Sequence, residues 1–320
     1  MQFNYQKKKT YTKYWNNFSE KPKKITYISN AFKKLKNYLK KNLGFRISIR
    51  INKNIIKKDQ AYLSYPIENI VKKNRNYLIF KEIDSFLKNS KLKYKKKELI
   101  KYVEEFEFVF MQSPVKEHES GFGYNEGVFF YSILRIIKPE LVIESGVMKG
   151  FTTYLIDTAT DKNCKIFCYD INFDNKIFHS QKATYINLDI SKNIPSIKNK
   201  KVVALWDDHT SQLDRLIFSQ EHKIEYNFFD DDLSLLNIHS DGWPPVPTIS
   251  MLKDIKDKDI QSDEFNWVSR NRKGTAYLKT FQDTDCFDKI KFHKIFPQLY
   301  EITGYKNHSQ CSLVINNIAR

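Results

Sequence analysis

The chain has 320 residues, 41% of them hydrophobic and 15% aromatic, which is enough to bury a sizeable core in one large domain or two smaller ones. No run of about eighteen apolar residues occurs and the first residues lack an apolar core, so neither a membrane span nor a secretory peptide is expected. The four cysteines have no disulfide-framework or metal-ligand spacing, so we expect reduced thiols in a cytoplasmic protein.

Positive charge is concentrated in the first third of the chain. Residues 1–100 hold 27 Lys or Arg against 6 acidic residues, whereas the remainder has a small excess of acids. We predict a basic, mainly helical region over 1–110, with one helix over 32–43, where apolar residues form a single stripe, and another around 93–110. Its lysines would form a solvated helical surface, or would bind the inner membrane face, an anionic glycan or another polyanion, with nucleic acid as a further alternative.

From residue 111 the chain alternates between helix and strand. A loop with Pro114, Gly121 and Gly123 leads into a helix over 125–138, which Pro139 ends. The elements predicted next are strands over 141–145, 165–170, 184–188, 202–206 and 225–229, and helices over 151–160 and 211–220. This alternation favours an α/β fold, with a Rossmann-like, doubly wound, mostly parallel sheet in a domain over 111–320.

The alternation stops after the strand at 225–229. A long irregular stretch over about 233–288 is predicted to be an insertion that covers or contacts a substrate, because long connections in compact domains are usually functional. Two final strands, over 289–296 and 311–318, are expected to pair as an antiparallel hairpin. The sheet would then have an antiparallel C-terminal strand.

Residues 141–153, LVIESGVMKGFTT, have the pattern of a buried strand, a glycine-cornered turn and the start of a helix. Gly146 and Gly150 stand where a tight corner and a close backbone approach require a missing side chain. Glu144 is expected to direct its carboxylate into the same crevice. The following strand ends at Asp170, where an acid commonly binds ribose hydroxyls. The spacing predicts a small polar cofactor beyond the carboxyl ends of these strands.

Two groups of acids follow the next two buried strands. Two bare carboxylates about 5 Å apart repel by roughly 3 kcal/mol at an effective dielectric constant near 20, so a shared hard cation such as Mg²⁺ would stabilise such a cluster. Alternatively, some of these acids cap the helices that follow. The groups are Asp207, Asp208 and His209 after the strand at 202–206, and Asp230, Asp231 and Asp232 after the strand at 225–229.

The segment ESGVMKGFTT resembles the first motif, ExGxxxGxS/T, of class I S-adenosylmethionine-dependent methyltransferases, and especially that of the metal-dependent O-methyltransferases related to catechol and macrocin O-methyltransferases. The resemblance covers roughly 125–235 and implies S-adenosylmethionine and a divalent cation, Mg²⁺, as cofactors. The residues it assigns are Glu144, Gly146, Gly150 and Thr152 at the methionine end of the cofactor, Asp170 at the ribose, Asp189 near the adenine, and Asp208, Asp231 and Asp232 or Asp230 at the metal.

One position departs from the catechol-type enzymes, which carry a lysine base just after the first metal acid. This chain has Thr210 and Ser211 there. We expect His209 to act as the general base beside Asp208, because an unperturbed imidazole titrates near neutrality. A histidine that only orients an aspartate or caps a helix would fit the same position.

These features predict a metal-assisted O-methyltransferase that acts on a hydroxyl of a small molecule or glycan, such as a surface-polysaccharide sugar or a secondary metabolite. Two alternatives stay open: an RNA methyltransferase that uses the basic region as a clamp, and a binding module that keeps the cofactor fold without turnover. The acceptor is not encoded in a recognisable motif, because variable loops build the substrate pockets of this fold.

Overall fold

The computed structural model describes residues 67–116, 122–235, 244–257, 262, 264–269, 272–277, 285–306 and 309–318. The chain divides into two compact units, Met1–Leu63 and Ser64–Arg320, and the described residues belong to the second. The predicted helix over 32–43 and the basic runs before residue 64 lie outside the described residues.

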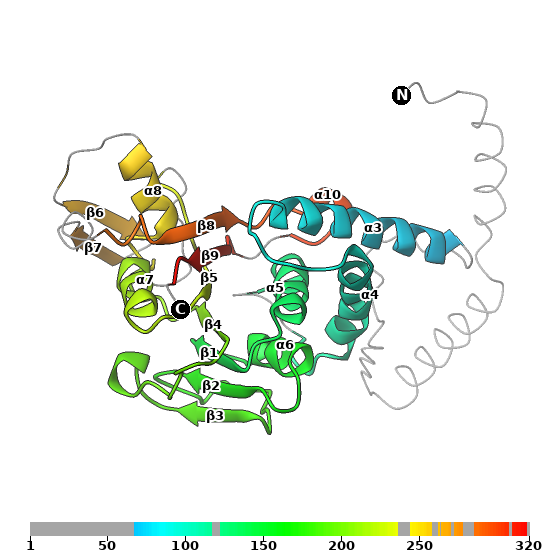
Figure 1. The fold of residues 1–320 in the computed structure, drawn as a ribbon, viewed down its shortest axis with the longest axis horizontal. Coiled ribbons are helices and arrows are strands. Elements are labelled where there is room, and N and C mark those ends of the chain that lie inside the picture. Colours follow the sequence, from blue (N-terminus) through cyan, green and yellow to red (C-terminus); the bar gives the residue numbers. More distant parts are fainter. Residues whose placement is uncertain are drawn as a thin grey trace, which may run out of the picture. The chain divides into compact units, whose positions relative to one another are not determined.

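The second unit is a sheet with helices on both faces (Figure 1). Its helices are α3 (Ile67–Leu87), α4 (Lys96–Gln112), α5 (Tyr124–Ile137), α6 (Phe151–Ala159), the short η2 (Ile190–Lys192), α7 (Gln212–Glu221), α8 (Ile249–Asp257) and α10 (Tyr300–Thr303). Its strands are β1 (Leu141–Ser145), β2 (Lys165–Tyr169), β3 (Ala183–Ile186), β4 (Val202–Trp206), β5 (Tyr226–Phe229), β6 (Glu264–Ser269), β7 (Arg272–Tyr277), β8 (Ile290–Ile295) and β9 (Ser312–Asn316).

Seven strands form the main sheet in the order β3-β2-β1-β4-β5-β9-β8. Strands β1 to β5 pair in parallel, whereas β9 runs antiparallel to both β5 and β8. The strand order reverses between β1 and β4, because β2 and β3 extend the sheet on one side of β1 and β4 and β5 extend it on the other. This is the predicted Rossmann-like, doubly wound sheet with an antiparallel C-terminal strand. Ligands of such sheets bind beyond the carboxyl ends of the strands at the reversal.

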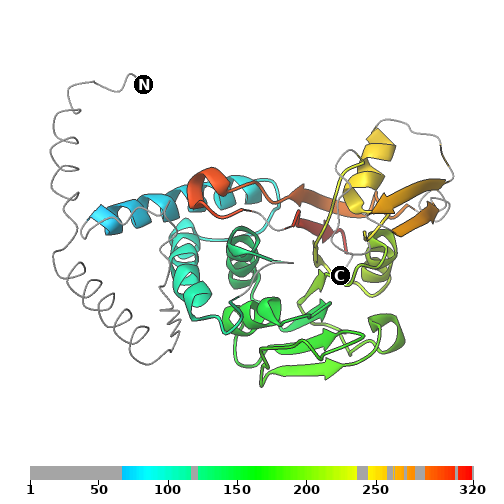
Figure 2. The ribbon, with the colours of Figure 1, turned by 180° about the vertical axis from the view of Figure 1, so that it is seen from behind.

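Alternate residues of the central strands face two separate apolar cores. Val142, Val203 and Phe228 belong to the core that α3 to α6 complete, while Ile143 and Ala204 belong to the core that α7 and α8 complete. Figure 2 shows the sheet and its helices from behind. Because both faces are covered, every residue of β1 and β4 is buried, which explains their continuous apolar sequences. All four cysteines, Cys164, Cys168, Cys286 and Cys311, are free and buried, as expected.

The two helices before the sheet contribute to the first of these cores. Ile79 and Ile83 of α3 are completely buried, as are Leu99 and Phe106 of α4. The ring of Phe106 lies 5.2 Å from that of Tyr124 at the start of α5. The described part of the predicted basic region is therefore helical and packs within the same unit as the sheet. No helix in this described part of the chain is both long and apolar enough to cross a bilayer.

The segment between β5 and β8 contains regular structure where an irregular stretch was expected. It includes α8 and an antiparallel hairpin of β6 and β7. Trp267 of β6 covers Gly274 of β7 so closely that an added Cβ would lie 2.5 Å from the indole ring. On α8, Ile249, Leu252 and Ile255 are buried at helical spacing. The expectation of an irregular stretch is wrong for these residues, and a role in contacting substrate stays a prediction.

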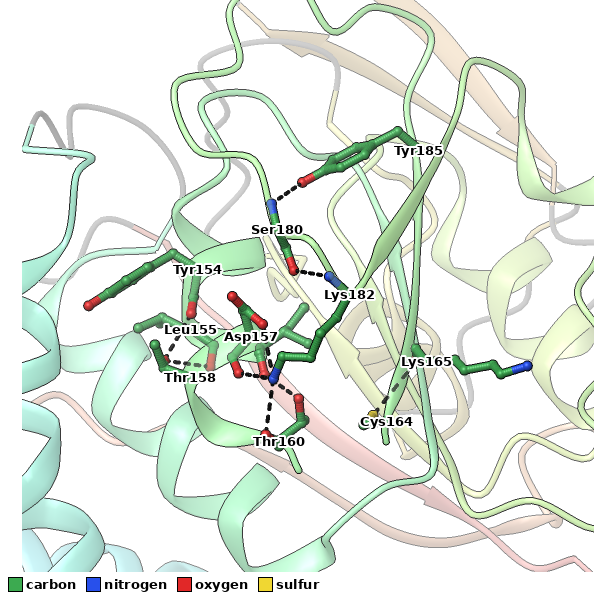
Figure 3. A network of polar contacts seen from close by, with 11 residues as sticks. Tyr154, Leu155, Asp157, Thr158, Thr160, Cys164, Lys165, Ser180, Lys182 and Tyr185 are labelled. Atoms are coloured by element: carbon green, nitrogen blue, oxygen red, sulfur yellow. Dashed lines mark hydrogen bonds and ion pairs between the residues drawn. The ribbon is translucent and has the colours of Figure 1, made fainter. Parts of the chain in front are cut away.

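A lysine next to β3 holds the C-terminal end of α6 (Figure 3). The Nζ of Lys182 donates to the backbone oxygens of Asp157 and Thr160, at 2.5 and 3.2 Å, and lies 2.9 Å from the Asp157 carboxylate. A cation at this end of a helix binds carbonyls that lack helical partners. Lys182→Met is expected to lower the free energy of unfolding by about 1 kcal/mol, since partial exposure screens the ion pair. Urea denaturation measures this loss.

The control is Lys165→Met, which removes the same charge from an exposed position at the start of β2. Its free energy of unfolding should stay within about 0.5 kcal/mol of the parent protein. Equal losses in the two variants would mean that net charge, rather than the helix end, determines the result.

Candidate active site

The loops that follow β1 and β4 meet at the point where the strand order reverses. The backbone N–H of Asp207 donates to the Ser145 oxygen at 2.8 Å. A Cβ on Gly146, whose φ is 91°, would lie 2.1 Å from the Asp207 carbonyl oxygen. Gly150 ends the loop with φ of 83° and caps α6. The corner itself therefore requires glycine at 146, and a cofactor contact at either glycine stays a prediction.

The carboxylate of Glu144 does not point into the crevice. It is completely buried and accepts hydrogen bonds from Thr152 Oγ1, from Thr153 Oγ1 at 2.6 Å and from Cys168 Sγ at 3.2 Å. The expected direction of the Glu144 side chain is corrected, because its hydrogen bonds join β1 to α6 through Thr152 and Thr153 and to β2 through Cys168. Burial raises the pKa of Glu144 to about 7, although the three donors act in the opposite direction.

Asp170 lies beside the glycine loop, where the ribose acid was expected. Its carboxylate accepts hydrogen bonds from the backbone N–H groups of Val147 and Met148, at 2.8 and 3.2 Å, and from that of Asn172 at 3.0 Å. The carboxylate therefore holds the loop after β1 in place. The residue is partly exposed, which leaves it accessible to a diol.

Three exposed apolar residues stand in the loops that meet at Asp170, and we call them the apolar rim. Met148, Ile171 and Leu188 are 48%, 85% and 50% exposed and follow β1, β2 and β3. Their loops meet, because Met148 N and the Asn187 side-chain amide both donate to Asp170. Exposed apolar residues gathered in one place commonly mark a binding site. The rim was not predicted from the sequence, where the one indication of it is an aliphatic residue directly after the predicted ribose acid.

A buried arginine that the sequence analysis did not single out holds two predicted site residues. Arg215, in the first turn of α7, is 4% exposed. Its Nε and Nη2 lie 2.9 and 2.7 Å from Asp208 Oδ2, and its guanidinium also binds the Asp189 carboxylate. Burial alone would raise the pKa of Asp189, but hydrogen bonds from Arg215 and Ser191 lower it to about 2.

Asp207, Asp230 and Asp231 follow the neighbouring strands β4 and β5, and we call them the acidic group. The charges of Asp207 and Asp230 interact, and the Ser309 hydroxyl donates to Asp230. Burial and the neighbouring charge of Asp231 raise the pKa of Asp230 to about 7. Burial and the Asp230 charge raise the pKa of Asp207 well above its ordinary value. The pair therefore retains a proton near neutrality. Asp207 was predicted as a member of the acid cluster, without a role of its own.

His209 lies at the exposed side of this acidic group. Its Nδ1 is 4.0 Å from Asp231 Oδ2, and 44% of its side chain is exposed. His209 and Asp231 have φ of 54° and 51°, in the left-handed region that side chains seldom adopt. The structure thus brings the predicted base next to one predicted metal ligand and leaves it open to a substrate.

Asp232 is placed in a different environment from the one predicted. It is completely buried, its Oδ2 lies 2.8 Å from His293 Nε2 on β8, and its Oδ1 accepts from the Ser250 N–H of α8 at 2.7 Å. Burial alone would raise the pKa of Asp232, but the His293 ion pair lowers it below its ordinary value. The expected metal ligation by Asp232 is corrected, because its two oxygens connect the end of β5 to α8 through Ser250 and to β8 through His293.

The predicted ligands do not fit a metal centre. Both oxygens of Asp208 are engaged: Oδ1 accepts from Thr210 N at 3.1 Å, and Oδ2 binds Arg215 and accepts from Ser145 Oγ at 2.5 Å. The Asp232 carboxylate binds His293 and Ser250 instead. Within the residues that the structure describes, no three His, Cys, Asp or Glu side chains are grouped so that they could hold an ion.

No protein-family model matches the sequence, and no curated protein matches it. Among solved structures, the O-methyltransferase TomG from Streptomyces achromogenes, in complex with S-adenosylmethionine, matches at 8% identity with a TM-score of 0.37 over 74% of this chain and 96% of its own. The O-methyltransferase from Bacillus cereus, in complex with S-adenosylhomocysteine, matches at 9% identity with a TM-score of 0.33, over 73% and 97%. CmcI with Mg and S-adenosylmethionine matches at 11% with a TM-score of 0.32, over 58% and 69%. These values are too low to transfer a function to this chain.

Proposed function

We propose that the protein is an S-adenosylmethionine-dependent O-methyltransferase that acts on a hydroxyl of a small molecule or glycan. The observation that carries the proposal is the grouping of the glycine loop, Asp170 and the apolar rim at the carboxyl ends of β1, β2 and β3. The acidic group with His209 lies at the neighbouring ends of β4 and β5.

The carboxyl ends of β1, β2 and β3 suit the binding of S-adenosylmethionine, and those of β4 and β5 suit the acceptor hydroxyl. Asp170 offers a carboxylate to the two ribose hydroxyls, and Met148, Ile171 and Leu188 offer apolar contact to a purine ring. S-adenosylmethionine, when bound there, supplies a methyl group on a sulfonium. The chain's own part would be to align an acceptor hydroxyl with that methyl group, and His209 would accept the hydroxyl proton. His209 suits this step because it is exposed and adjacent to Asp231.

The Asp170→Ala variant is expected to bind S-adenosylhomocysteine more weakly than the parent protein by about 1.5 to 3 kcal/mol. The substitution removes a charged acceptor from the ribose and also removes the partner of the Val147 and Met148 N–H groups. Isothermal titration calorimetry measures both affinities, with one ligand bound per parent chain.

The control for this variant is Asp174→Ala, four residues away and exposed, which removes the same charge without touching the loop. Its affinity should equal that of the parent protein. The absence of any S-adenosylhomocysteine binding by the parent protein would refute the proposed function, and equal affinities for Asp170→Ala and the parent would remove Asp170 from the site.

The proposal also includes the acceptor and the place in the cell where the protein acts. A hydroxyl on a surface-polysaccharide sugar or a secondary metabolite is the acceptor we favour, presented by an anionic carrier that the lysines of residues 1–66 bind. These residues lie outside the described part of the chain. The protein would then act in the cytoplasm or at the inner membrane face.

A further inference from the structure

Arg215 occupies an unusual position for a positively charged residue. It lies in the first turn of α7, where the positive end of the helix dipole disfavours a cation. Its side chain is also 5% exposed, so its charge is withdrawn from water. The unfavourable helix dipole and the loss of hydration are offset only by strong, well-placed partners of the guanidinium.

The compensation comes from carboxylates that follow two different strands. Asp189 comes after β3 and Asp208 directly after β4, and the same guanidinium binds both. The guanidinium carbon also lies 5.6 Å from the centre of the Trp206 ring, within the range of a cation–π contact. Arg215 therefore fixes the loops after β3 and β4 relative to each other.

The same contacts occupy the oxygens that a metal would need. Asp208 was the first predicted ligand, and its Oδ2 accepts from Arg215 Nε and Ser145 Oγ while its Oδ1 accepts from Thr210 N. A divalent ion that binds Oδ2 would have to displace the guanidinium. Arg215 already provides a positive charge at the carboxyl end of β4.

We propose that the guanidinium of Arg215 takes the place of the predicted divalent cation, so that the cofactor site binds its ligand without a metal. The inference rests on the proposed methyltransferase function and deepens it. Arg215 is a positioning residue here: it holds Asp189 on the side where the adenine was predicted and Asp208 on the side of the acceptor.

The first experiment titrates the full-length protein with Mn²⁺ and follows the free ion by electron paramagnetic resonance. The parent protein should show no saturable binding up to about 1 mM, the weak end of the affinities of protein sites for divalent cations. Its dissociation constant for S-adenosylhomocysteine should be the same within twofold in EDTA and in excess Mg²⁺. Saturable Mn²⁺ binding by the parent protein, lost in Asp231→Asn, would overturn the proposal.

The second experiment compares Arg215→Met with Arg215→Lys. The methionine variant removes the charge and releases the two carboxylates, so it should gain binding of one Mn²⁺ ion, and the additional change Asp208→Asn should remove that binding. The lysine variant keeps the charge and should bind none. A folded Arg215→Met protein that binds no Mn²⁺ would contradict the proposal, and if this variant does not fold, the titration of the parent protein decides.

The two proposals fail in different ways. If the parent protein binds S-adenosylhomocysteine in neither EDTA nor Mg²⁺, the methyltransferase function is refuted, whereas the Mn²⁺ titrations still test the role of Arg215. If binding of S-adenosylhomocysteine appears only with Mg²⁺, the cofactor function stands and the Arg215 proposal is refuted.

Discussion

Gly146→Ala is expected to lower the free energy of unfolding by about 3 to 5 kcal/mol and to abolish measurable S-adenosylhomocysteine binding. The φ of 91° already disfavours any side chain, and the new Cβ would lie 2.1 Å from the Asp207 carbonyl oxygen. That oxygen belongs to the backbone and cannot rotate away. The loops after β1 and β4 would have to separate where the ligand crevice is expected. Urea denaturation gives the stability, and calorimetry gives the affinity.

Gly304→Ala is the matched control. Gly304 has φ of 73°, at the end of α10, but no heavy atom lies within 4 Å of the position of its Cβ. The substitution therefore adds the backbone strain without the clash and should cost about 1 kcal/mol, with unchanged affinity for S-adenosylhomocysteine. If Gly146→Ala costs no more than Gly304→Ala, the close approach of the two loops is not what requires glycine at 146.

The elements that position the site were predictable from local sequence. β1 and β4 have the predicted bounds, 141–145 and 202–206, because strands buried on both faces need uninterrupted apolar residues. The other elements predicted between 93 and 229 differ from the structure by at most three residues at either end. The glycine corner and Asp170 were also identified, since their spacing follows from the length of one strand, turn and helix.

The partners of the acids were not predictable in the same way. All three acids after β5 are adjacent in sequence, yet Asp230 meets Asp207 while Asp232 meets His293, 61 residues later. Which direction each side chain takes depends on the turn after the strand, where Asp231 adopts a positive φ. Arg215 could not be predicted for a related reason. A single arginine in a polar helix gives no sequence motif, and its partners, Asp189 and Asp208, come from separate loops.

The regular structure between β5 and β8 was missed because its evidence is weak in sequence. The α8 helix has nine residues, and the β6–β7 hairpin has Gly274 inside a strand, a residue that usually weakens strands. The hairpin tolerates this glycine because the Trp267 ring covers it. Such compensation arises from the packed pair and is absent from either strand alone.

The Glu144→Gln variant is expected to lose a large part of the pH dependence of stability. The folded pKa of Glu144, about 7, exceeds its ordinary value of 4.5, so the folded protein binds the extra proton between these two values. Stability from this group is complete below the lower value and is lost as the pH rises through the upper one. The loss is about 3 kcal/mol in the parent protein, because each pKa unit corresponds to about 1.4 kcal/mol.

Glutamine has the shape of the protonated acid and cannot ionise, so position 144 should contribute no loss of stability over that range in the variant. The three donors to Glu144, Thr152, Thr153 and Cys168, keep an amide oxygen as acceptor, and the threonine hydroxyls can accept from the amide nitrogen. The variant should therefore fold and should exceed the parent protein in stability at the alkaline end.

Urea denaturation at a series of pH values from about 4.5 to about 8 tests this difference, since unfolded-state carboxyl groups titrate near the lower limit. The difference between the parent and Glu144→Gln isolates Glu144, because Asp207 and Asp230, whose pKa values are also raised, titrate in both proteins. Glu221→Gln, at the exposed end of α7, serves as the control and should follow the parent curve. Parallel curves for the parent and Glu144→Gln would show that Glu144 is already ionised in the folded protein, and that the two threonines and Cys168 stabilise the carboxylate more strongly than burial destabilises it.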